Sequence, residues 1–152
     1  MNIVFIAGEG GHAAQFKRFL MKSGLTNKFM VLTDEGNSSF KGFPVICSGS
    51  IRGKFGFTLK DFVFYFYRFI FKIMPRLIYE GDCIISFGPG VAIMPAVIFK
   101  LLGRKVIHIE TWSRFKSKSM TGKFMYYIAD VFYVQNESLL KVYPKAIFSG
   151  RL

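Results

Sequence analysis

Short apolar runs alternate along the chain with segments whose apolar residues recur at helical spacing. Each run stops at a glycine, a proline or a polar cluster, which is typical of buried strands. The runs predict strands at residues 2–7, 29–33, 44–47, 82–87, 105–109, 131–134 and 146–148. The helical spacing predicts helices at residues 13–22, 59–79, 91–102 and 120–129. This alternation indicates an α/β fold: a single Rossmann-like domain over residues 1–152, with a parallel sheet and helices on both faces.

The predicted helix at residues 59–79 carries two apolar stripes, which is more than one contact with a core would use. Its surplus aromatic and basic side chains favour insertion into the interface of an anionic membrane; a protein partner or complete burial would also account for the surplus. The candidate membrane contacts are Phe62, Phe64, Tyr67, Arg68, Phe71 and Lys72. Pro75 is expected to kink or end this helix.

Composition and charge narrow the function classes. The 152 residues are 51% hydrophobic, which excludes a disordered tail, and carry a net charge of +12. The excess of basic residues predicts an anionic counterpart: nucleic acid, anionic lipid or phosphate groups. With 19 Phe in a chain of this size, some aromatic surface is expected to face a membrane or a partner.

The first candidate site is the glycine turn GEGGHAAQ at residues 8–15, which follows a strand and opens a helix. Gly10 and Gly11 would let a ligand approach the backbone, and free N–H groups at a helix start bind phosphate. His12 stands at the mouth of this turn, where it could contact a phosphate or act as a base. A tight turn with a capping histidine is the alternative. The GxGxxG pattern with its downstream acid is missing, so a nicotinamide cofactor is only weakly supported.

The second candidate is the turn SFGPGVA at residues 86–92, again between a strand and a helix. Gly88 and Gly90 could simply shape this turn. However, ligands of open parallel sheets bind beyond the carboxyl ends of the strands, so one cleft could use both glycine turns.

The third candidate is the basic segment at residues 108–123. Glu110 ends a strand at the same edge, where one acid in a basic loop could be a base or a hydroxyl ligand. Arg114 and Lys123 could hold phosphates. A solvated loop in which Ser119 caps the next helix is the alternative. His108 alternates with apolar neighbours and is expected to be a core histidine whose ring nitrogens are satisfied by hydrogen bonds.

These motifs together resemble the asparagine-linked glycosylation protein fourteen family and the bacterial capsule and exopolysaccharide proteins of the PssD and CpsF type. The matching pieces run in order through nearly the whole chain. They are GGH at 10–12, S-FGPG at 86–90, IET-S-R at 109–114, S-TGK at 119–123, AD-FYVQ at 129–135 and YPKAIFSGRL at 143–152.

The resemblance implies the amino-terminal half of a GT-B glycosyltransferase of the MurG type, which agrees with a chain that ends directly after a strand. Such a half holds a lipid diphosphate-sugar acceptor and docks on the membrane. A small donor-binding subunit resembling asparagine-linked glycosylation protein thirteen would bind the UDP-sugar, and the pair would transfer the sugar during capsule or exopolysaccharide biosynthesis. The expected location is the cytoplasmic face of the cell membrane, as a peripheral, bacterial-type protein.

The resemblance also suggests roles for the candidate residues. His12 is the first candidate for the catalytic base and Glu110 the rival. Gly10, Gly11, Gly88, Gly90, Arg114, Ser119 and Lys123 would bind the acceptor and its diphosphate. Neither a cofactor nor a metal ion is expected, because helix N-termini and basic groups can meet the charge on the leaving UDP.

Two other function classes fit parts of the sequence. A stand-alone Rossmann-type nucleotide-binding enzyme would use the first glycine turn, but the downstream acid is missing. A basic nucleic-acid-binding module would use the net charge, but lysines and arginines are spread along the chain without a recognised motif.

Overall fold

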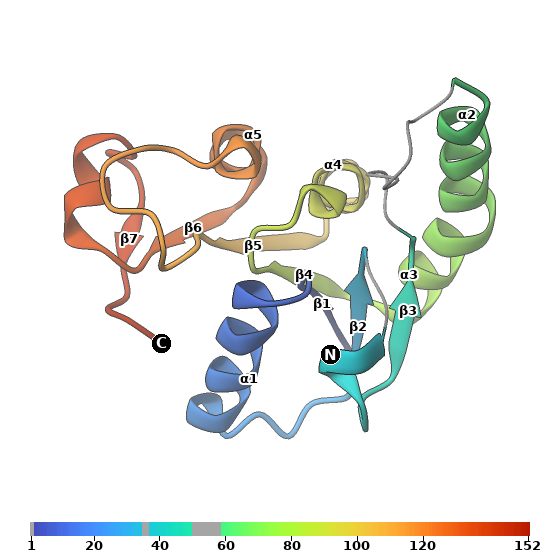
Figure 1. Ribbon diagram of the computed structural model, residues 1–152, viewed down its shortest axis with the longest axis horizontal. Helices are drawn as coiled ribbons and strands as arrows, with labels where there is room; N and C mark the ends of the chain where they lie inside the picture. Colours follow the sequence, from blue (N-terminus) through green and yellow to red (C-terminus); the bar gives the residue numbers. More distant parts are fainter. Residues whose placement is uncertain (1, 35–36, 50–58) are drawn as a thin grey trace.

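The computed structural model describes residues 2–34, 37–49 and 59–152. In this part of the chain, strands pair in parallel in the order β3-β2-β1-β4-β5-β6-β7 (Figure 1). The strands are β1 Ile3–Ile6, β2 Phe29–Thr33, β3 Val45–Cys47, β4 Cys83–Ser86, β5 Lys105–Ile109, β6 Val131–Val134 and β7 Ile147–Phe148. The chain builds outward from β1 to β3 and then crosses back to β4 on the other side of β1. That reversal leaves a crevice at the carboxyl ends of β1 and β4.

Helices cover both faces of the sheet, as the sequence predicts. The α-helices are α1 Gly11–Ser23, α2 Leu59–Arg68, α3 Met74–Glu80, α4 Ile93–Leu101 and α5 Met120–Ile128. Short 3-10 turns lie at Asn37–Phe40, Gly90–Ala92 and Glu137–Lys141. Figure 1 shows α1 on the opposite side of the sheet from α4 and α5.

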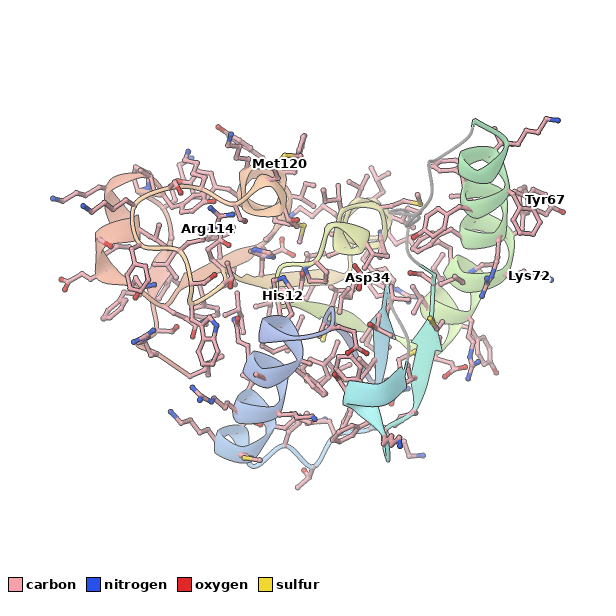
Figure 2. All side chains as sticks on the ribbon, in the orientation of Figure 1. His12, Asp34, Tyr67, Lys72, Arg114 and Met120 are labelled. Carbon is pink, nitrogen blue, oxygen red and sulfur yellow. The ribbon has the colours of Figure 1, made fainter. Side chains whose placement is uncertain are left out.

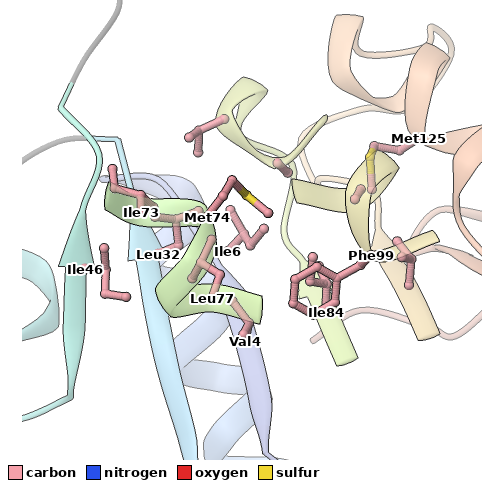
Figure 3. Packing of buried hydrophobic residues seen from close by; sticks show 14 of the residues in the cluster. Val4, Ile6, Leu32, Ile46, Ile73, Met74, Leu77, Ile84, Phe99 and Met125 are labelled. Atoms are coloured by element: carbon pink, nitrogen blue, oxygen red, sulfur yellow. The ribbon is translucent and has the colours of Figure 1, made fainter. Parts of the chain in front are cut away.

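Each face of the sheet has its own core. On one face, Val4, Ile84 and Phe99 belong to the cluster that joins the sheet to α3, α4 and α5 (Figure 3). On the other, Phe5 of β1 packs edge-on against Phe16 of α1, with ring centroids 5.2 Å apart. Edge-to-face contacts of this kind add to the stabilisation from burial, and they account for part of the high phenylalanine content.

The predicted helix at residues 59–79 is one helical segment with an irregular middle. A π-helical turn, Phe69–Ile73, joins α2 to α3, and the N–H of Met74 donates to the carbonyl of Phe69. Pro75 is the second residue after this wide turn, which accommodates the missing N–H of the proline. The helix therefore passes through Pro75 and ends only at Glu80.

Candidate functional site

A cleft of about 650 Å³ opens at the carboxyl edge of the sheet. Its lining comes from the segments that follow β1, β2, β4 and β5, together with residues at the start of α5 and one tyrosine of α2. These residues are Gly8, Glu9, His12, Asp34, Tyr65, Gly88, Pro89, Gly90, Val91, Thr111, Ser113, Arg114, Ser119, Met120 and Thr121. The three segments that the sequence singled out thus meet at one site.

His12 lies in the first turn of α1 and lines the centre of the cleft. Its Nδ1 is buried and, within the described residues, has no hydrogen-bond partner. Gly88 makes room for the ring: a Cβ at Gly88 would lie 2.9 Å from Cε1 and 3.2 Å from Nδ1 of His12. Gly88 also has φ of +107°, a backbone conformation that favours glycine. The first predicted glycine turn therefore supplies His12, and the second supplies the glycine against which its imidazole packs.

Gly10 and Gly11 are less central than the sequence suggests. Gly10 is the N-cap of α1 with φ of +65°, and both glycines are exposed but lie outside the cleft lining. The lining residue from this turn is Glu9, which accepts a 2.6 Å hydrogen bond from the hydroxyl of Ser39. An acidic side chain at this turn opposes the binding of a phosphate beside it.

Asp34 is a cleft residue that the sequence analysis missed. It follows β2, and its Oδ1 is buried with no hydrogen-bond partner in the described part of the chain. A Cβ on Gly8 would lie 3.2 Å from Oδ1 of Asp34 and 3.4 Å from Cδ2 of His12, so the two side chains flank the same glycine. A signal for it is present in the sequence: Asp34 is an acid directly after a predicted buried strand, which is the pattern that selected Glu110.

Glu110 lies beneath the cleft and does not line it. Its residue is fully buried, and its carboxylate accepts hydrogen bonds from the N–H of Thr111 (2.9 Å), the hydroxyl of Ser119 (3.0 Å) and the phenol of Tyr143 (2.8 Å). Its carbonyl accepts a 2.9 Å bond from Nε2 of Gln135. The carboxylate therefore ties the loop after β5 to the start of α5.

Two neighbours of Glu110 depend on this arrangement. Ser119 caps α5 by accepting a hydrogen bond from the N–H of Gly122, as the alternative interpretation predicted, and it also lines the cleft. Burial, followed by the charge and the hydrogen bond of Glu110, raises the pKa of Tyr143 well above its usual value. Tyr143 therefore stays a phenol and donates to the carboxylate.

The structure brings some of the predicted phosphate ligands to the cleft and leaves others outside it. Arg114 is exposed and lines the cleft on the β5 side, beside Ser113 and Ser119. Gly90 also lines the cleft. Lys123 is exposed on α5 but lies outside the lining, so the structure does not bring it to the site.

His108 is a core residue, as the sequence predicts, but the expectation that its ring nitrogens are hydrogen-bonded is wrong: both are buried without a partner among the described residues. It is fully buried on β5, with its ring centroid 4.9 Å from that of Phe132. Burial, and to a smaller extent the charge of His12, lowers the pKa of His108 to about 3. His108 is therefore neutral at physiological pH.

The comparisons with known proteins agree with this geometry. The family model described as "Oligosaccharide biosynthesis protein Alg14 like" matches residues 3–152. The chain belongs to the Alg14 family.

Curated relatives in this family carry the name "UDP-N-acetylglucosamine transferase subunit ALG14". The rat protein is 22% identical over 100% of this chain and 83% of its own length. The Candida albicans protein is 25% identical over 99% of this chain and 78% of its own length. The chain is accordingly a glycosyltransferase subunit.

Solved structures show the same fold. The MurG protein of Acinetobacter baumannii superposes with a TM-score of 0.65 at 18% identity, covering 90% of this chain and 42% of that one. The UDP-N-acetylglucosamine 2-epimerase of Rickettsia bellii superposes with a TM-score of 0.68 at 14% identity, covering 99% of this chain and 45% of that one. The chain thus spans less than half the length of each structure, and the expected resemblance to one half of a GT-B enzyme is confirmed for the fold.

The Alg14-family chain presents an aromatic surface on the segment from α2 to the π-helical turn. Phe64 is 69% exposed, Tyr67 56% and Phe71 64%, and the rings of Tyr67 and Phe71 lie 4.7 Å apart. Arg68 and Lys72 are exposed between them, and Figure 2 shows Tyr67 and Lys72 on the outer side of this segment. Phe62, the remaining predicted membrane contact, has a side chain outside the described part of the structure. We name Phe64, Tyr67 and Phe71 the aromatic patch.

Two further observations concern the described residues as a whole. Across the described residues, no helix is both long and apolar enough to cross a bilayer. The same residues contain no group of three or more His, Cys, Asp or Glu side chains placed to hold a metal ion.

Proposed function

We propose that this chain is the acceptor-binding, membrane-associated subunit of a two-chain glycosyltransferase. The enzyme would transfer a sugar from a UDP-sugar to a lipid diphosphate-linked sugar during capsule or exopolysaccharide biosynthesis. UDP-N-acetylglucosamine is the first donor to test, because the curated relatives are named for it. The observation that carries the proposal is the cleft lined by His12, whose Nδ1 has no hydrogen-bond partner among the described residues, together with Gly8, Gly88 and Arg114.

His12 is the proposed catalytic base. His12 lines the cleft, whereas Glu110 is buried and already accepts three hydrogen bonds at its carboxylate. In the reaction, the acceptor oxygen bonds to the anomeric carbon of the donor sugar, the bond from that carbon to UDP breaks, and His12 takes the proton of the acceptor hydroxyl. Glu110 would act as a positioning residue, because it fixes Thr111 and Ser119 at the cleft wall.

The donor is proposed to bind mainly on a separate small subunit resembling asparagine-linked glycosylation protein thirteen. An apolar recess of about 280 Å³ supports the presence of a partner. It lies on the sheet face that α1 covers only in part, and its lining residues are Phe19, Ile85, Ile107, Ile109, Tyr133, Ser149 and Leu152. Exposed apolar recesses of this kind are typical of interaction sites.

Attachment to the cytoplasmic face of the cell membrane is proposed through the aromatic patch. Aromatic side chains with adjacent Arg and Lys suit the interface of an anionic bilayer. Tyr65 lies on the same helix and lines the cleft, so an attached α2 would hold the site close to lipid-linked acceptors.

The test is reconstitution of the two-chain enzyme. A tagged chain is purified from native membranes in mild detergent, the co-purifying chains are identified by mass spectrometry, and sugar transfer from UDP-sugars to a short-chain isoprenyl diphosphate sugar is measured. We expect one small UDP-sugar-binding chain in near-equal amount and transfer by the pair. Recovery of the chain alone from the soluble fraction, together with tight binding of UDP to it, would instead support a stand-alone nucleotide enzyme.

The base assignment is tested in the same assay with three variants. His12→Ala should lower turnover about 100-fold, a typical contribution of a positioned base, and leave the free energy of unfolding unchanged. Glu110→Gln should lower both turnover and stability, because it disturbs a buried network. Lys17→Ala, an exposed change on the same helix as His12, is the matched control and should alter neither. Near wild-type turnover of His12→Ala would exclude His12 as the base.

A further inference from the structure

The cleft is divided by charge. The acidic side chains of its described lining are Glu9 and Asp34, which follow β1 and β2. Its arginine, Arg114, follows β5 and lies beside Ser113 and Ser119. Figure 2 shows Asp34 and Arg114 on opposite sides of His12. One end of the cleft therefore accepts hydrogen bonds and repels anions, and the other end attracts anions.

The carboxylate of Asp34 is a hydrogen-bond acceptor at the acidic end of the cleft. Asp34 is half-buried and lines the cleft, and its Oδ1 is buried with no hydrogen-bond partner among the described residues. An ionised carboxylate accepts hydrogen bonds but cannot donate them. A diphosphate has only acceptors at neutral pH and does not suit this carboxylate, whereas the hydroxyl groups of a sugar can donate to it.

The neighbouring atoms place such a hydroxyl close to the proposed base. Oδ1 of Asp34 and Cδ2 of His12 lie 3.2 and 3.4 Å from the position that a Cβ on Gly8 would take, so a sugar bound at Asp34 would lie close to His12. Burial, together with a smaller contribution from the charge of Asp34, raises the pKa of Tyr65 and keeps its phenol protonated. Tyr65 thus offers a second polar group on the α2 side of the same end of the cleft.

The strand order sets the span between the two ends. Asp34 follows β2 and Arg114 follows β5, and the order β2-β1-β4-β5 places three strand spacings between them. At about 4.8 Å per spacing this is roughly 14 Å between the strand ends, so a ligand that reaches both residues must be extended, as a sugar joined to a diphosphate is.

We propose that Asp34 binds the sugar of the lipid diphosphate-sugar acceptor, accepting hydrogen bonds from its hydroxyl groups, while Arg114 holds the diphosphate at the other end of the cleft. This inference rests on the proposed function and gives the acceptor a direction across the sheet edge. It makes Asp34 a residue that selects the sugar and places the reacting hydroxyl beside His12.

Binding measurements on the purified full chain, with any partner that co-purifies, test this assignment. The probes are citronellyl diphosphate, which lacks a sugar, and citronellyl diphosphates that carry glucose, galactose or N-acetylglucosamine. Calorimetry in mild detergent gives the dissociation constants for the wild type, Asp34→Asn and Arg114→Ala. Asp34→Asn keeps the shape of the side chain, and urea unfolding verifies that each variant is folded.

We expect wild type to bind its preferred sugar-bearing probe at least tenfold more tightly than the sugarless probe. Asp34→Asn should weaken the sugar-bearing probe about tenfold, as expected for the loss of a hydrogen bond to a charged group, without weakening the sugarless one. Arg114→Ala should weaken both. Equal effects of Asp34→Asn on both probes, no effect on either, or no sugar preference in the wild type would overturn the assignment of Asp34. Failure of the wild type to bind any isoprenyl diphosphate would instead refute the proposed function itself.

Discussion

At the scale of single residues, Gly122 shows how tightly the network under the cleft is packed. A Cβ at this position would overlap Oε2 of Glu110 and lie 2.5 Å from the phenol oxygen of Tyr143 and 2.7 Å from Oγ of Ser119. Gly122→Ala should therefore destabilise the fold by about 3 kcal/mol, through overpacking and the loss of a buried hydrogen bond. Urea unfolding of the purified protein measures this change.

The matched control for Gly122 is Gly90. A Cβ at Gly90 meets nothing within 4 Å, and its φ is not positive, so Gly90→Ala should change the free energy of unfolding by no more than about 0.5 kcal/mol. If both alanine variants unfold at the same urea concentration, the network around Glu110 does not constrain this part of the fold.

The sequence predicted site residues best where a glycine pattern marked them. His12 and Gly88 could be found because strand–glycine–helix turns are visible in the sequence and meet at one sheet edge. The burial of Glu110 could not be predicted, because it depends on Tyr143, which is 33 residues away in the chain. Asp34 was missed because a lone acid before a polar stretch looks like part of a solvated loop.

At the scale of elements, the aromatic patch makes a prediction about membrane binding. Phe64→Ser combined with Phe71→Ser should lower partitioning onto anionic phospholipid vesicles at least tenfold, because two exposed apolar rings are lost. Co-sedimentation with vesicles of phosphatidylcholine and phosphatidylglycerol measures the bound fraction. Raising the salt concentration should weaken binding further, because Arg68 and Lys72 contribute by charge.

Tyr79 is the control on the same helical segment. It is 91% exposed on α3 and lies beside Asn2 and Lys28, toward the amino ends of the strands. Tyr79→Ser should therefore leave vesicle binding unchanged. Equal losses for Tyr79→Ser and the double variant would mean that binding is non-specific and that the aromatic patch is not the attachment site.

The elements themselves could be predicted well from periodicity. Every predicted strand and helix has a counterpart in the structure, with shifts at the ends. The π-helical turn before Pro75 could not be predicted, because apolar spacing does not distinguish a wide turn from a regular one. This turn matters because it changes which side chains continue the outward face after Tyr67.

At the scale of the whole molecule, strand–helix alternation was enough to predict a parallel sheet with two covered faces. The order of the strands could not be derived from the pattern alone. In the structure, β2 and β3 add on one side of β1, and β4 to β7 add on its other side. That order brings distant segments to one edge and gives the cleft its two ends.

The whole fold also responds to pH through His108. The unfolded chain binds a proton at this imidazole near pH 6.5, whereas burial lowers the pKa in the folded state to about 3. Between these two values the unfolded state binds more protons, so acidification destabilises the folded state. From pH 7.5 to pH 5, this group alone should lower the free energy of unfolding by about 2 kcal/mol.

Urea unfolding at several pH values separates His108 from other titrating groups. His108→Leu removes the imidazole and keeps an apolar side chain next to Phe132, so its stability should depend less on pH between 7.5 and 5. Working above pH 5 keeps most carboxylates ionised in both states. The same pH dependence in wild type and variant would show that a different group links folding to protons. A reduced dependence would show that His108 stays neutral in the folded state down to pH 5 and that its burial links folding to protons.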